Sequence, residues 1–263
     1  MLALPQAAFF LLLELAAGGS IALFWVHLRG EVPQGFTRFT GACLLVCGAL
    51  AIWLRSSFPP SDLAPPATLW FQAERILTIA FVIVFAVYLV VPAARFVGPL
   101  VPLLALASLW SASLVVTSSQ LSGIGVPLAV LAGGMALGTA VAGLSLGHWY
   151  LVSPTMGIQP LIRLTFLCLG AVIVQLVLLP ILLFGPGASS AAVQRLFGED
   201  GLFLGVRIIF GLLVPAAALL MTWRTARIRS LDSATGLLYI VAALVLAGEI
   251  AARTLFFLTG VAT

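Results

Sequence analysis

The last apolar stretch of the chain, residues 244–257, carries two charged side chains, Glu249 and Arg253. They are four residues apart with the acid first, so on a helix they lie one turn apart on the same face. The stretch around them is long enough to cross a bilayer, where a charged side chain is costly unless it pairs or faces a protein interior. The spacing therefore predicts an ion pair that points into a bundle of helices.

Other ionisable side chains also fall within apolar stretches. They are Glu14, Arg55, Glu74, Arg75 and Arg207, together with two histidines, His27 and His148. A carboxylate next to a redox-active group can take up or release a proton, and an arginine can stabilise a reduced, negatively charged form of that group. These residue types are therefore suited to proton-linked redox chemistry inside a membrane, provided that helices bring them together.

The composition determines the kind of element that must position these residues. The chain of 263 residues is 62% hydrophobic and only 8% charged, which is typical of a bundle of membrane-spanning helices and excludes an ordinary soluble domain. The excess of positive charge comes from arginine alone and is read as a topology signal, so we expect no nucleic acid partner. The first apolar run has Glu14 in its middle and no basic segment before it, so we do not expect a cleaved signal peptide.

Eight apolar segments can be delimited, and they predict an all-α integral membrane protein, a single transmembrane helical domain over residues 1–263. The segments are approximately 5–28, 39–54, 69–91, 99–117, 126–152, 160–184, 202–223 and 233–258. The fifth is rich in glycine, with Gly134 and Gly138 in one GxxxG pattern and Gly143 and Gly147 in another. Because small residues at that spacing allow close approach of a neighbouring helix, we expect this segment to be central.

The distribution of arginine predicts the topology. The loops after the odd-numbered segments hold or border seven arginines (29, 38, 95, 163, 224, 227 and 229), whereas the loops after even-numbered segments hold Arg55 and Arg195. We therefore expect both termini outside and the protein in the cell inner (cytoplasmic) membrane as a multi-pass protein. At about 1.5 Å per residue, the buried acids and arginines then share the outer half of the bilayer.

Charges gathered at one depth favour a polar pocket between helices that accepts a guest with a polar head and an apolar tail. A quinone, menaquinone or ubiquinone, has that form. The expected quinone-binding residues are Glu74, Arg55, Glu249, Arg253, Glu14 and Arg207. The alternative is structural ion pairing, of Glu249 with Arg253 and of Glu74 with Arg207 or Arg55.

Two further alternatives stay open. His27 and His148 lie at the cytoplasmic ends of the first and fifth segments, and a b-haem ligated by two histidines would need them on adjacent helices at matching depth. Each could instead be an anchor at headgroup level. A transporter or assembly factor is the other alternative, because Pro180 and Pro215 could break their helices and broken helices often line substrate sites.

Part of the chain resembles a known family. The run Gly248-Glu249-Ile-Ala-Ala-Arg253 followed by two phenylalanines, and the opening run 4–10, resemble the membrane anchor subunit of DMSO reductase and its NrfD-like (polysulfide reductase) relatives. In that family an acid at the position of Glu74 lies by the quinol site. The family's His-Leu-Gly-x-Pro pattern at the end of the second helix is replaced here by Arg55-Ser-Ser-Phe-Pro59.

The resemblance implies a function. An anchor of this family has no metal of its own and is not itself catalytic. It holds an iron–sulfur subunit and a molybdenum-type catalytic subunit at the membrane, and it exchanges electrons with the quinone pool. The resemblance therefore implies a quinone-interacting subunit of a respiratory oxidoreductase complex.

Overall fold

The computed structural model describes residues 3–60, 63, 65–91, 96–117, 125–153, 155–185 and 190–263. Arg95, one of the arginines used for the topology prediction, lies outside these residues. All regular elements of the described part are helices, and eight of its spans are long and apolar enough to cross a membrane. The predicted all-α bundle of eight transmembrane helices is therefore confirmed, and the chain is a multi-pass membrane protein.

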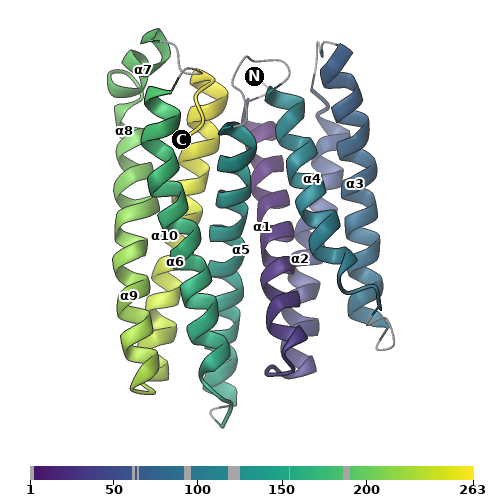
Figure 1. The fold of residues 1–263 in the computed structure, drawn as a ribbon, viewed down its shortest axis with the longest axis vertical. Coiled ribbons are helices and arrows are strands. Elements are labelled where there is room, and N and C mark those ends of the chain that lie inside the picture. Colours follow the sequence, from purple (N-terminus) through teal and green to yellow (C-terminus); the bar gives the residue numbers. More distant parts are fainter. Residues whose placement is uncertain are drawn as a thin grey trace.

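The first six spans and the last are continuous helices, whereas the seventh changes its hydrogen-bond pattern along its length. The first six are α1 (Ala3–Leu28), α2 (Gln34–Ser57), α3 (Pro65–Val90), α4 (Leu100–Thr117), α5 (Gly125–Val152) and α6 (Gln159–Phe184). The seventh span joins α8 (Gly201–Gly205), the π-helix η2 (Val206–Leu213) and α9 (Val214–Arg227), and the last is α10 (Leu231–Thr259). Figure 1 shows both chain ends at the same end of the bundle.

The helices extend further than the apolar segments predicted. α2 begins at Gln34, so Arg38 belongs to it, and α9 continues to Arg227. Glutamine and arginine are good helix formers, so the backbone stays helical where the chain leaves the apolar layer. The predicted loop 185–200 also contains a short helix, α7 (Ser190–Phe197).

Glycines bring α1 and α5 into backbone contact at the centre of the bundle. A Cβ atom on Gly138 would come within 2.0 Å of the backbone N of Gly19, and one on Gly18 within 1.8 Å of the carbonyl oxygen of Gly134. Besides α1, helix α5 packs against α4, α6 and α10. The predicted central place of this helix, and of its first GxxxG pattern in packing, is confirmed.

The two prolines do not break the helices as the transporter alternative supposed. Pro180 lies inside α6, which continues on both sides of it. Pro215 lies in the first turn of α9, directly after the wider turns of η2. Since proline has no N–H to donate, this change of hydrogen-bond pattern accommodates it without interrupting the span.

Candidate functional site

The buried ionisable side chains form two separate groups. The first, here called the shallow cluster, consists of Gln6, Arg55 and Glu74. The second, the deep cluster, consists of Glu14, Gln175, Arg207, Glu249 and Arg253. Every one of these residues lies in the half of its span nearer the end that carries both termini, as the helix bounds and Figure 1 show together.

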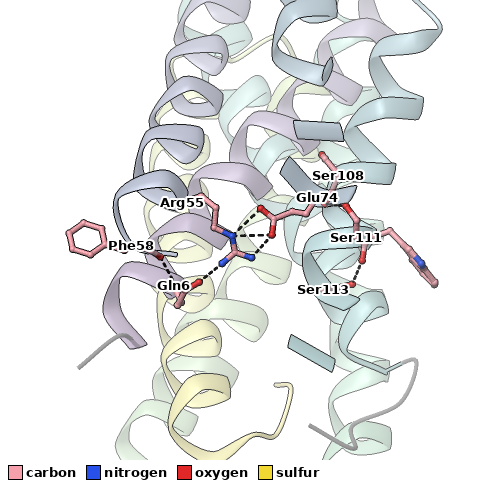
Figure 2. Close-up of polar contacts among 8 residues, drawn as sticks. Gln6, Arg55, Phe58, Glu74, Ser108, Ser111 and Ser113 are labelled. Atoms are coloured by element: carbon pink, nitrogen blue, oxygen red, sulfur yellow. Dashed lines mark hydrogen bonds and ion pairs between the residues drawn. The ribbon is translucent and has the colours of Figure 1, made fainter. Parts of the chain in front are cut away.

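Arg55 is the centre of the shallow cluster. Its Nε donates to both carboxylate oxygens of Glu74 at 3.0 Å, and one terminal nitrogen also contacts that carboxylate. Its other terminal nitrogen donates to Oε1 of Gln6, whose amide donates to the carbonyl oxygen of Phe58 at 3.0 Å. Figure 2 shows Gln6 and Glu74 on opposite sides of the guanidinium group. Three helices, α1, α2 and α3, thus meet at one ion pair, and the predicted pairing of Glu74 with Arg55 is present.

Aromatic rings cover the remaining faces of this ion pair. The guanidinium carbon of Arg55 lies 4.2 Å from the ring centroid of Phe9 and 5.3 Å from that of Phe71. Arg75, the next residue after Glu74, is exposed on the outside of the bundle and lies 5.9 Å from the same Phe71 ring. Cation–π contacts of this kind stabilise an arginine where little water reaches it.

A small cleft opens beside the shallow cluster. It is lined by Phe9, Ile52, Arg55, Ser56, Glu74, Arg75, Thr78 and Ile79. Its interior volume is about 20 Å³, and the empty space including its mouth is about 260 Å³. The hydroxyl of Thr78 is buried and makes no hydrogen bond. The cleft therefore combines an apolar wall with an ion pair and an available hydroxyl group.

The deep cluster is a chain of alternating charges that crosses the bundle. Arg207 donates to Oε1 of Glu249 at 3.0 Å and to Oε1 of Gln175 at 2.7 Å. Arg253 lies 3.2 Å from Oε2 of Glu249 and 2.7 Å from Oε1 of Glu14. Two arginines thus balance two glutamates, and the predicted pairing of Glu249 with Arg253 is present.

Glycines let the backbone of neighbouring helices come close to the deep cluster. A Cβ atom on Gly133 of α5 would lie 2.6 Å from Nη2 of Arg253 and 2.6 Å from Oε2 of Glu249. Gly211 and Gly248 bring η2 and α10 so close that a Cβ on Gly211 would lie 2.6 Å from Cα of Gly248. The charged side chains of the deep cluster are at most 2% exposed, so no lipid-soluble guest reaches them in this structure.

The structure therefore does not bring the six predicted residues into one pocket. Glu74 and Arg55 border the cleft, whereas Glu14, Arg207, Glu249 and Arg253 belong to the deep cluster. Gln6 and Glu14 are eight residues apart on α1, about 12 Å along the helix axis. Six residues on five spans can share a depth without sharing a site, because a helix in a bundle touches only its neighbours.

The two histidines have different surroundings. Nδ1 of His27 lies 3.2 Å from Oγ1 of Thr37 on α2, and its ring packs edge-on against Tyr88 of α3. His148 is exposed on α5. Although α1 and α5 are adjacent, His27 is thus engaged on the side of α2 and α3.

Sequence reasoning missed the neutral polar members of both clusters, Gln6, Thr78 and Gln175. Each is a neutral polar residue within a largely apolar helix, and each is at most 8% exposed. A glutamine within a spanning segment is the signal that could have found two of them, because an amide buried among apolar side chains needs a partner.

A larger groove of about 500 Å³ lies between α5 and α6, but all the side chains that line it are apolar. It has no group that could fix a polar head, so the cleft at Arg55 and Glu74 is the candidate site. No protein-family model and no curated protein sequence matches the chain. The functional inference consequently rests on the geometry of the two clusters and on the resemblance of the motifs.

Proposed function

We propose that the chain is a membrane anchor and quinone-interacting subunit of a multi-subunit oxidoreductase in the cell inner (cytoplasmic) membrane. The single observation that carries the proposal is the cleft that leads from the outside of the bundle to the Arg55–Glu74 ion pair. A charged pair in a spanning segment is costly, so a pair that borders an opening is a candidate site by default.

The residues around the cleft fit the headgroup of a quinone. Its carbonyl groups need hydrogen-bond donors, which Thr78, Arg55 and the exposed Arg75 supply, and its ring needs apolar walls such as Phe9 and Ile79. The interior holds no more than about one water molecule, so a ring belongs at the mouth, with its tail in the bilayer.

When bound, a quinone supplies redox chemistry that couples electrons to protons. Glu74 can hold a proton at a carboxylate oxygen beside the cleft, and Arg55 orients that carboxylate through Nε. Gln6 fixes Arg55 from the other side. The chain thus contributes binding and proton handling.

The partners follow from the resemblance. An iron–sulfur subunit and a molybdenum-type catalytic subunit would dock on the outer side, where the arginine distribution predicts both termini. Both cluster positions lie toward that end of the bundle, which shortens the path between the cleft and a docked redox centre. Co-purification of the chain from its own membranes, with identification of the attached subunits, tests the partners, and a reporter enzyme fused after Thr263 tests the side.

Quinone binding tests the site itself. Short-chain menaquinone and ubiquinone are titrated against the purified chain in lipid nanodiscs, with tryptophan fluorescence as the readout. Glu74→Gln and Thr78→Val should each weaken binding by about tenfold, roughly 1.4 kcal/mol. Thr222→Val is the matched control, because the Thr222 hydroxyl is equally buried but bonds only to Ala218 of its own helix. Equal affinity in all three variants would refute the site.

A further inference from the structure

The deep cluster contains polar atoms that have no hydrogen bond. Both carboxylate oxygens of Glu14, the Nε atoms of Arg207 and Arg253, and Nε2 of Gln175 are buried and lack one. Inside a membrane bundle, bulk water cannot compensate such atoms. They can therefore bind a small polar ligand.

The unpaired atoms limit what that ligand can be. Three of them, on Arg207, Arg253 and Gln175, are N–H donors, and two, on Glu14, are acceptors. An anion would satisfy only the donors, and a cation only the acceptors. Water does both, and buried waters typically bridge otherwise unpaired groups of this kind.

The backbone around the cluster is shaped for this site. Gly133 of α5 leaves room for the side chains of Glu249 and Arg253, since a Cβ there would overlap both. Arg207 lies in the π-helix η2, and π-helical turns are frequent at functional sites because they re-aim side chains. The glycine and the wide turn come from different helices, and both lie next to side chains of the deep cluster.

The two glutamates of the cluster are not equivalent. Glu249 accepts hydrogen bonds from both Arg207 and Arg253. Glu14 lies 2.7 Å from Nη2 of Arg253, but the contact is not directed as a hydrogen bond, and its second oxygen has no partner. Glu249 is therefore held by two donors, whereas Glu14 has a carboxylate oxygen that is free for a further partner.

The other helices that pack against α1 bring no competing charge to Glu14. α4 has no charged residue, and α5 has only His148, close to its far end. α2 has Arg38, close to its far end, and Arg55, which is engaged by Glu74. Glu14 therefore faces Arg253 and Glu249 of α10 and Arg207 of η2, and no other described charge.

We propose that the deep cluster is an internal proton-binding site in which the free carboxylate oxygen of Glu14 takes up a proton from water. A hydronium ion gives its proton to the free carboxylate oxygen of Glu14. One O–H bond breaks in the hydronium, one forms on the carboxyl group, and no electron moves. Arg253 then remains paired with Glu249, and the net charge of the cluster changes from zero to +1.

Infrared difference spectroscopy tests this proposal on the full chain in lipid nanodiscs, with no quinone present. Between a higher and a lower pH, the C=O stretch of a protonated, buried carboxyl group should appear, and it should shift in D₂O because the carboxyl proton is replaced by deuterium. The band should be lost in Glu14→Gln and kept in the matched control Glu31→Gln, whose carboxylate pairs with Arg163 at the bundle end.

Absence of the band in the wild-type chain, or its persistence in Glu14→Gln, would overturn the proposal. Glu14→Asp covers the case in which Glu14→Gln does not fold. It keeps the carboxyl group but moves it away from Arg253, so the band should shift in frequency, and an unshifted band would also overturn the proposal. Since no quinone is added, the result is independent of the proposed function.

Discussion

The shallow and the deep cluster place the same kinds of residue in different surroundings. In the shallow cluster, one arginine and one glutamate border a cleft that reaches the outside of the bundle. In the deep cluster, two arginines and two glutamates are enclosed by glycine contacts between helices. In the shallow pair every side-chain nitrogen and carboxylate oxygen has a hydrogen-bond partner, whereas five polar atoms of the deep cluster have none.

The difference shows that an intramembrane charge does not define a function by itself. A well-bonded ion pair at an opening can bind a molecule that enters from the bilayer, because that molecule takes the place of lipid at the opening. A closed and incompletely bonded network cannot receive such a guest, but it can hold water and protons. The following variants test how much each of these two regions contributes to the free energy of unfolding.

Removing one charge from the deep cluster should have the largest effect. Arg253→Met leaves Glu14 without an arginine and Glu249 with only Arg207, so two buried carboxylates share one cation. Breaking a buried ion pair in this way costs about 3–5 kcal/mol. Thermal unfolding of the purified chain in detergent should show the corresponding fall in Tm.

A control variant and a double variant test the interpretation of that result. Arg224→Met removes an exposed arginine near the end of α9 and should change Tm little. The double variant Glu14→Leu with Arg253→Met removes one charge of each sign and should recover part of the loss. A single Arg253→Met variant as stable as Arg224→Met would show that the deep network contributes nothing.

The glycine contact between α1 and α5 should come next. In Gly138→Ala the new Cβ would lie 2.0 Å from the backbone N of Gly19, so α1 and α5 must separate. Overpacking of this kind costs about 1–3 kcal/mol. Gly170→Ala is the control, because a Cβ there meets no atom within 4 Å; equal Tm values for the two variants would contradict the tight crossing.

Loss of the shallow carboxylate should be milder. In Glu74→Gln, Arg55 keeps its bond to Gln6 and its contacts with Phe9 and Phe71, and the new amide oxygen can still accept from it. We expect a loss of about 1 kcal/mol in the free energy of unfolding. A loss as large as that of Arg253→Met would mean that the cleft does not relax around Arg55, and the contrast between the clusters would disappear.

The ion pair at the opposite end of the bundle should have the smallest effect. Arg163 and Glu31 are 29% and 31% exposed, so solvent screens them. Glu31→Gln should cost about 0.2–1 kcal/mol, and the cost should fall as salt is added. A loss of stability that exceeds that of Glu74→Gln and does not change with salt would show that this pair behaves as a buried ion pair.

Much of the fold follows from local pattern. Apolar runs of spanning length predicted all eight helices, and glycine spacing predicted that α5 would pack closely with a neighbour. The ends were less accurate, because Gln34 and Arg227 continue helices beyond the apolar layer. The short helix α7 was missed because eight residues give little periodicity to read.

The candidate site was predicted only in part. The pairs Arg55–Glu74 and Glu249–Arg253 could be anticipated, because a charge within a membrane is stabilised by pairing with an opposite charge nearby. The partners of Glu14 and Arg207 could not, because Arg207 is 46 residues before Arg253 and nothing local relates either of them to α1. Gln6 and Gln175 complete the two clusters through contacts that join distant parts of the chain.

The sequence alone determined that this chain crosses a membrane eight times and carries its buried charges toward one end, because hydropathy and residue order fix how deep each side chain lies. Only the tertiary structure decided which charges meet. Depth is a coordinate along the helix, but contact depends on which helices are neighbours and how each is rotated about its axis. The glycine crossings of α1 with α5 and of η2 with α10 set both, and they separate an open pair from a closed network.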